Sequence, residues 1–230
     1  MHQHDHHAHH GEPSLEELRQ ALTADFWDQR YDGSDRVWSG RPNARLVEHA
    51  TDLAPGTALD VACGEGGDAI WLAQRGWRVT AVDVSEVALR KVAIHAEQAG
   101  VADRVRLGLY DALDEPRPAG RRRFDLVTVS FLHVPVPDFA PIYRGISDAV
   151  APGGRLLVTA HHPDDVSTGA RHDHGPGLMF EPERVLTTLA VDAAGSPWEV
   201  EVADTPVREQ QMPDGPVRVK DTVVRLRRTL

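Results

Sequence analysis

The sequence predicts an α/β fold with a mostly parallel sheet and helices on both faces. Between residues 57 and 162, short apolar segments typical of strands alternate with amphipathic segments typical of helices, and several of the latter end at glycine. At the C-terminus, two strand-like segments, 198–207 and 217–228, follow each other around the turn-rich "MPDGP". Two consecutive strands predict an antiparallel pair that closes one edge of the sheet.

The alternation defines the core elements in chain order. Glycine or proline after a periodic segment marks where each helix is expected to stop. Strands are expected at 57–62, 77–85, 104–112, 124–134 and 155–162, and helices at 68–76, 86–100, 137–154 and 182–190.

The first 56 residues are expected to form a tail and a helical arm. Residues 1–13 carry six of the thirteen histidines and have no hydrophobic periodicity, so we expect a disordered tail. Ser14 can cap a helix with acids in its first turn, and residues 43–53 predict a helix stopped by Pro55. In between, a polar, turn-rich segment contains a group of aromatics that predicts a lid or binding wall: Phe26, Trp27, Tyr31 and Trp38.

Composition limits the class of protein. A formal net charge of −10 disfavours nucleic acid as a partner, and one cysteine, Cys63, allows no intramolecular disulfide. No apolar run approaches the roughly 20 residues that span a bilayer, and no signal-peptide core follows Met1. We therefore expect a soluble cytoplasmic protein, a monomer or homodimer, that acts on a small molecule away from membranes. Residues 14–230 are expected to form one domain, with 14–56 as lid and helices and 57–230 as core.

The stretch "LDVACGEGGDA" (59–69) predicts a ligand loop after the first core strand. Ala62, Gly64 and Gly67, with an acid at the end of the next strand, nearly satisfy the dinucleotide fingerprint. Asp60 argues against that ligand, since a carboxylate repels a pyrophosphate and suits a cationic sulfonium or amino group. Asp111, after the third strand, can accept from an adenine amino group. The loop therefore favours an adenosyl sulfonium ligand.

Three further segments follow the loop along the chain and carry a resemblance to a known family. "LYDA", "FDLVTVSFLH" and "APGGRLLVTAHH" succeed the loop, and together residues 57–160 resemble class I S-adenosylmethionine-dependent methyltransferases. "FWDQRY" and "VWSGRPN" resemble the N-terminal lid of the thiopurine S-methyltransferase and tellurite-resistance branch. The resemblance implies a Rossmann-like, seven-stranded sheet with an antiparallel C-terminal strand, and S-adenosyl-L-methionine as cofactor.

The resemblance also implies the residues that hold this cofactor. Asp60 and Gly64 to Gly66 would hold the methionine end, Asp83 the ribose hydroxyls, and Asp111 the adenine. Ala62 departs from the glycine usual in the family, and we expect it to be tolerated through a negative φ. The implied cofactor-binding set is Tyr31, Trp38, Arg41, Asp60, Ala62, Gly64, Gly66, Asp83, Val84, Asp111, Ala112 and Ser130.

The methyl acceptor is expected to be a small molecule, and the branch resemblance implies a thiol or another sulfur, selenium or tellurium nucleophile. A thiol needs little help to ionise, whereas an alcohol or amine needs a general base. His133 and His162 are the leading candidate bases; His161 is a further candidate, which could instead simply cap its strand end by hydrogen-bonding to the backbone. His172 and His174 could form a metal site with His161 and His162, or could lie in a solvated loop.

Two other functions stay open at this point. The histidine-rich tail could make this a metal-handling protein through loose sites at His4, His6, His7, His9 and His10, with no metal expected in the core. The near-fingerprint allows a nicotinamide-dependent oxidoreductase.

Overall fold

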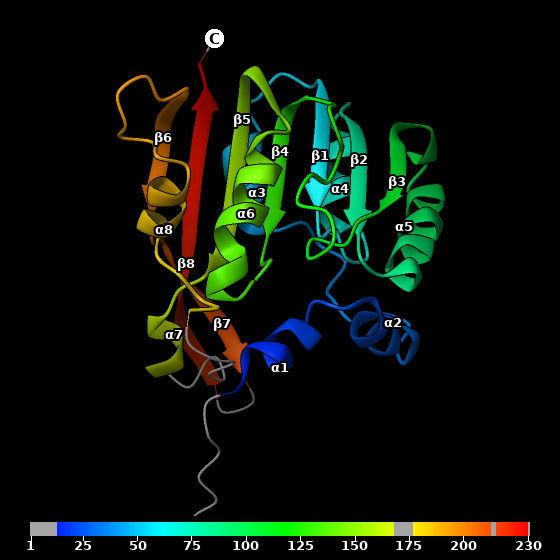
Figure 1. The fold of residues 1–230 in the computed structure, drawn as a ribbon. Helices are drawn as coiled ribbons and strands as arrows, with labels where there is room; N and C mark the ends of the chain where they lie inside the picture. The colour runs from blue at the N-terminus through cyan, green and yellow to red at the C-terminus, as the bar shows by residue number, and fades with distance from the viewer. Residues whose placement is uncertain (1–12, 168–176, 213–214, 230) are drawn as a thin grey trace, which may run out of the picture.

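The structure is a computed structural model that describes residues 13–167, 177–212 and 215–229. Its centre is a sheet in which seven strands follow the order β3-β2-β1-β4-β5-β8-β6 (Figure 1). Strands β1 to β5 run parallel and β8 runs antiparallel to both neighbours, which confirms the predicted fold class. The strands are β1 (Thr57–Val61), β2 (Arg78–Asp83), β3 (Val105–Leu109), β4 (Phe124–Ser130), β5 (Val150–His161), β6 (Trp198–Asp204) and β8 (Gly215–Arg228).

An additional strand, β7 (Val207–Met212), pairs with the first part of β8 and lies off the main path. The described residues thus hold eight strands rather than the expected seven. The segment expected as one strand over 198–207 breaks after Asp204. Pro206 lies in the break, where its missing N–H cannot serve a sheet ladder.

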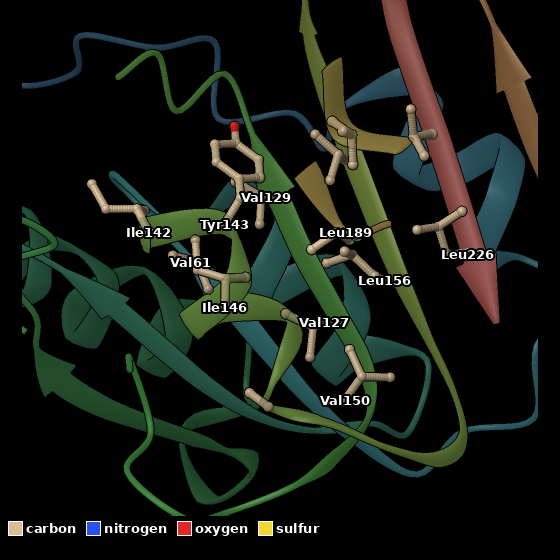
Figure 2. Packing of buried hydrophobic residues seen from close by; sticks show 14 of the residues in the cluster. Val61, Val127, Val129, Ile142, Tyr143, Ile146, Val150, Leu156, Leu189 and Leu226 are labelled. Atoms are coloured by element: carbon tan, nitrogen blue, oxygen red, sulfur yellow. The ribbon is translucent and has the colours of Figure 1, made fainter. Parts of the chain in front are cut away.

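Two hydrophobic clusters cover the two faces of the sheet. On one face, Ile142 and Ile146 of α6 (Val136–Ser147) belong to one cluster with Val127 of β4 (Figure 2). On the other, Leu72 of α4 (Gly67–Gln74) packs with Leu126. Neighbouring β4 residues thus point to opposite clusters, as the two-residue period of a strand requires. α8 (Pro182–Thr188) lies with α6, and α3 (Ala44–Ala50), α4 and α5 (Glu86–Gln98) contribute to the second cluster.

The β5 boundary differs from the prediction. Residues 150–154 were expected to end a helix, but α6 ends at Ser147 and β5 begins at Val150. Phe124 pairs with Val150 and donates its N–H to the carbonyl of Ala149, and the pairing resumes at Leu126 and Arg155 after a register shift. The strand thus continues past a glycine pair that looked like a helix stop. The remaining short helices are η1 (Ala102–Arg104) and α7 (Asp164–Ser167).

The N-terminal arm lies beyond the carboxyl ends of the parallel strands (Figure 1). Ser14 caps α1 (Leu15–Gln20) with the reciprocal hydrogen bonds of a capping box to Glu17. The aromatic segment was expected to be turn-rich, but Phe26, Trp27 and Tyr31 lie on α2 (Ala24–Asp32). Among the described residues, no helix has the length and apolar character needed to cross a bilayer. We call residues 26–43 the lid segment.

Candidate functional site

The loop between β1 and α4 contains three residues in the left-handed backbone region, Ala62, Gly64 and Gly66. Gly64 has φ +53° and Gly66 φ +84°, and a side chain at Gly66 would collide with Val92. Ala62 has φ +56°, so the expected negative φ is wrong. An L-residue in this region is strained by about 1–2 kcal/mol. The loop therefore keeps a glycine-like path even where the sequence has alanine.

Asp83, at the end of β2, fastens this loop to the sheet. Its carboxylate accepts hydrogen bonds from the backbone N–H of Gly64 at 2.8 Å and of Ser85 at 3.0 Å. Burial raises the pKa of Asp83 despite these donors. Each carboxylate oxygen has a second lone pair, so Asp83 can still accept from a ligand hydroxyl. The neighbouring Val84 is half-buried.

Asp60 lies beneath the same loop and is 1% exposed. Its Oδ1 accepts from Thr128 Oγ1 at 2.9 Å, whereas its Oδ2 is buried with no hydrogen-bond partner among the described residues. Burial, reinforced by the neighbouring Asp68 carboxylate, raises the pKa of Asp60 well above its usual range. A buried carboxylate oxygen without a partner is costly, and a cationic ligand group would relieve that cost.

Asp68 is a site residue that the sequence analysis missed. Its Oδ1 accepts from the N–H of Asn43 at 2.6 Å, and its Oδ2 accepts from Ser130 Oγ at 3.0 Å. Asn43 Nδ2 lies 3.3 Å from the same Ser130 oxygen. Asp68 thus joins the lid segment, α4 and the end of β4. An acid in the first turn of a helix was a visible signal, but it is also the ordinary choice for the helix dipole.

Glu65 is the second missed residue, and it joins the loop to the lid segment. Its carboxylate accepts from the N–H of Trp38 at 2.9 Å and of Val37 at 3.0 Å, and pairs with Lys91 at 3.0 Å. Burial alone would raise the pKa of Glu65, but these donors outweigh it and lower the pKa. Asp28, on α2, similarly accepts from Ser85 Oγ and the N–H of Val87.

The predicted lid residues meet the loop in different ways. Tyr31 is buried, its oxygen accepts from Trp38 Nε1 at 3.0 Å, and a Cβ at Gly64 would lie 3.0 Å from that oxygen. Arg41 has an exposed side chain, and it is its backbone carbonyl that approaches Gly67. The lid segment is therefore closed on the loop in this structure.

The predicted residues at the end of the third strand, β3, make fewer contacts within the site. Asp111 Oδ1 accepts from the N–H of Leu113 at 2.9 Å, which orders the turn after β3, and Ala112 is half-buried. An open groove of about 570 Å³ lies beside the loop, between α2 and α5, and is lined by Tyr31 and Lys91. Of the predicted cofactor-binding residues, Tyr31 alone lines this groove. The hydrogen bonds of the loop, and not the groove, therefore mark the candidate site.

Two histidines meet at the ends of β4 and β5. The rings of His133 and His161 stack with centroids 5.0 Å apart, and Phe131 stands 4.4 Å from His161. The N–H of His161 donates to His133 Nε2 at 3.3 Å. Phe131 has φ +59°, an uncommon conformation for an aromatic residue that turns the chain at this edge.

His162 makes different contacts. Its Nδ1 accepts from the N–H of Asp164 at 3.1 Å, and its Nε2 lies 3.9 Å from Glu181. Groups of three or more metal-ligating side chains are not found within the part of the chain that the structure describes. His172, His174 and the tail histidines His4, His6, His7, His9 and His10 lie outside the described residues.

The residues that gather at this edge fit a cationic adenosyl ligand. The observation that supports this fit is made at Asp60. Its buried Oδ2 lacks a hydrogen-bond partner among the described residues, and its charge suits an ammonium or sulfonium group. The loop also lies at the switch point between β1 and β4, where the strand order reverses and where open α/β sheets bind ligands.

Comparison with known proteins supports this geometry. Residues 58–154 match a family model described as a methyltransferase domain. A ubiquinone biosynthesis O-methyltransferase from Pseudomonas paraeruginosa is 30% identical over 140 residues, which cover 61% of this chain and 59% of that protein. The chain thus spans less than two thirds of this curated relative.

Two solved structures share the fold. A SAM-dependent methyltransferase from Anabaena variabilis superposes with a TM-score of 0.69 at 18% identity, covering 95% of this chain and 97% of that one. TehB from Haemophilus influenzae gives 0.64 at 18% identity, covering 90% and 67%.

Together the matches support the predicted methyltransferase domain over residues 58–154, and the solved structures share the predicted fold. S-adenosylmethionine is the cofactor that this domain implies. The matches described support neither of the two alternatives, the nicotinamide-dependent oxidoreductase and the metal-handling protein.

Proposed function

We propose that this protein transfers the methyl group of S-adenosylmethionine to a small-molecule acceptor. The observation that carries the proposal is the partnerless, buried Oδ2 of Asp60 beneath a glycine loop at the switch point of the sheet. A pyrophosphate would be repelled by this carboxylate, whereas the cationic end of S-adenosylmethionine would be attracted to it. The domain match over residues 58–154 supports the same activity.

The chain offers a distinct group for each part of the cofactor. Asp60, with Ala62, Gly64 and Gly66, would hold the methionine end. Asp83 would accept from the ribose hydroxyls beside Val84, and Asp111 with Ala112 would bind the adenine. Ser130 would line the methionine side of the site, and Tyr31, Trp38 and Arg41 would contribute from the lid segment.

When bound, the cofactor supplies an electrophilic methyl group on a sulfonium. The protein's part is to align the acceptor with that methyl and to exclude water. Glu65, Asp28 and Asp68 hold the lid segment against the loop and the start of α5 through five hydrogen bonds from main-chain and side-chain donors. A closed lid segment would keep the site dry during the reaction.

We propose a small acceptor with a chalcogen nucleophile. The lid segment's resemblance to the thiopurine and tellurite-resistance branch favours sulfur, selenium or tellurium, and the fold is shared with TehB. The relatives named as ubiquinone biosynthesis O-methyltransferases make oxygen the competing nucleophile. The net charge of −10 disfavours nucleic acid as acceptor. We further propose that residues 14–230 act as one domain, in a monomer or homodimer.

A competition screen tests the acceptor class. Tritiated S-adenosylmethionine is offered with thiols, selenols, tellurite, phenols and amines, and transfer to each is counted. We expect sulfur or selenium compounds to be methylated fastest. Preferred transfer to phenols or amines would contradict the proposed sulfur, selenium or tellurium nucleophile, and transfer to none of these compounds would contradict a small-molecule acceptor of these kinds.

A further inference from the structure

One edge of the sheet is formed by β3, and no other strand of the described residues pairs with its outer side. Tyr110, directly after β3, donates its N–H to the carbonyl of Asp83 at the end of β2. Backbone groups point alternately to the two sides of a strand, so the N–H and C=O groups of Leu107 and Leu109 point away from β2. An edge strand with outward-pointing backbone groups is a template for another strand.

The side chains of the same two residues are apolar and exposed. Leu107 is 39% exposed and Leu109 is 61% exposed. With Val105 they share the face of β3 on which α5 packs, because alternate residues of a strand share a face. A hollow of about 90 Å³ on this face is lined mostly by apolar side chains, from Ala93, Ala96, Glu97, Ala102, Val105 and Leu107. A further apolar side chain placed in this hollow would be removed from water.

The opposite edge of the sheet, β6, has features with which proteins discourage edge-to-edge pairing. Its pairing with β8 has a register irregularity between Val200 and Val202, and the carboxylates of Glu199 and Glu201 interrupt its apolar residues. By contrast, β3 pairs regularly with β2 and has a single charged residue, Arg106. The less protected edge is therefore the one with the exposed leucines.

We infer that β3 pairs with β3 of a second copy of this chain, antiparallel about a two-fold axis at Leu107. This register places Leu107 opposite its own copy and Leu109 opposite Val105 of the second copy, beside the hollow. Arg106 then lies opposite Gly108, which has no side chain to clash with it. The two sheets become one continuous sheet, and the outward N–H and C=O groups of both edge strands are hydrogen-bonded.

The register follows from the residues that flank this apolar group. An axis one residue nearer the C-terminus would place Asp111 opposite Val105, and an axis one residue nearer the N-terminus would place Asp103 opposite Leu109. A carboxylate that faces an apolar residue in a buried pair is costly. Of these registers, only the central one pairs the three apolar residues among themselves.

The helices that flank the axis carry complementary charges. Ala93 of α5 lines the same hollow as Leu107, so the axis passes close to the middle of α5. Arg90 and Glu97 are exposed and lie about one turn to either side of Ala93. The two copies of α5 run antiparallel on the same face of the joined sheet, which brings Arg90 of each copy toward Glu97 of the other. This charge complementarity favours a second copy as the occupant of the edge.

Sedimentation equilibrium of the full chain tests the dimer. We expect a reversible equilibrium, since two short strands with flanking helices make a small interface. Leu109→Lys should raise the dimer dissociation constant about ten-fold or more, because pairing would bury an ammonium group beside the hollow. Val200→Lys, on the exposed edge strand β6, is the matched control and should leave the constant unchanged. A wild type that stays monomeric even at millimolar concentration would overturn the inference, as would equal dimerisation of Leu109→Lys.

Disulfide trapping tests the register and does not depend on the lysine variant. In Leu107→Cys the two new thiols face each other across the axis, with Cα atoms about 5.5 Å apart and within reach of a disulfide. In Leu109→Cys the two Cα atoms are about 13 Å apart, beyond that reach. Mild oxidation should therefore cross-link Leu107→Cys, but neither Leu109→Cys nor the wild type with its single Cys63.

Two outcomes of the trapping experiment count against the pairing. Cross-linking of Leu109→Cys as fast as that of Leu107→Cys would overturn the register, and cross-linking of neither variant would overturn the pairing of the β3 edges. Both measurements are independent of methyl transfer, so a failure of the proposed function leaves this inference standing.

Discussion

At the residue scale, Ala62 marks the point where local chemistry and the required loop path disagree. Its φ of +56° is a conformation that glycine adopts without strain. Ala62→Gly should therefore raise the free energy of unfolding by up to about 1 kcal/mol, even though glycine is more flexible in the unfolded chain. Urea unfolding measures this change. Ala93→Gly, on the exposed side of α5, is the control and should lower stability by about 1 kcal/mol; equal losses in both would contradict the strain at Ala62.

The raised pKa of Asp60 makes cofactor binding pH-dependent. In the free protein, burial and the neighbouring Asp68 keep this carboxyl protonated above the usual carboxyl range. A raised carboxyl pKa also lowers stability as pH rises, because the unfolded chain loses its proton first. A cationic ligand beside Asp60 should lower the pKa, so binding should release protons and tighten as pH rises toward the free-protein pKa.

Calorimetry in buffers of different ionisation enthalpy counts the protons released on binding. Asp60→Asn keeps a side-chain oxygen for Thr128 and cannot titrate, so it should release fewer protons. An unchanged count would contradict a place for Asp60 at the cationic end of the ligand. The half-buried Asp68 and the buried Asp83, whose pKa values are also raised, would account for protons that are still released.

Sequence reasoning found the residues that carry a positional signal, such as Asp60 and Asp83 at strand ends. It missed Glu65 and Asp68, because their partners are the backbone groups of a lid segment distant in sequence. Neither charge pattern nor spacing reveals which main-chain N–H a carboxylate will meet. The φ of Ala62 was also mispredicted, since the path of the whole loop overrides the preference of one residue.

At the scale of elements, the lid segment is the part whose contacts decide access to the site. Asp60 is 1% exposed, and Tyr31 and Trp38 lie close to Gly64 of the loop above it, so we expect the lid segment to move when a ligand binds. The turn-rich structure predicted for this segment was wrong at Tyr31, which lies on α2. Aromatic spacing alone did not indicate a helix of nine residues.

Glu65→Gln should loosen the lid segment. The neutral amide loses the ion pair with Lys91 and accepts more weakly from the N–H groups of Val37 and Trp38. Hydrogen exchange over residues 34–42 should become about ten-fold faster, and S-adenosylhomocysteine should dissociate faster. Glu97→Gln, exposed on the same helix as Lys91, should change neither. Unaltered exchange in Glu65→Gln would contradict the role of Glu65 in holding the lid segment.

At the scale of the whole molecule, the alternation of strands and helices predicted the sheet and its antiparallel C-terminal strand. Buried parallel strands are short, apolar and separated by helices, so their pattern is strong. The errors lie where that pattern weakens: β7, which is half-exposed along its length, and residues 150–154, where paired glycines resemble a helix stop but continue β5.

The most direct test of the central claim is titration calorimetry with S-adenosylmethionine and S-adenosylhomocysteine, with NADH as the comparison ligand. We predict one site per chain for the adenosyl ligands and none for NADH. Asp83→Ala should weaken binding at least ten-fold through loss of the ribose acceptor and of the bond to Gly64, whereas the exposed Asp103→Ala should not. Absence of heat with both adenosyl ligands at millimolar concentration would contradict the account. Equal binding by Asp83→Ala and the wild type would contradict the ribose role of Asp83.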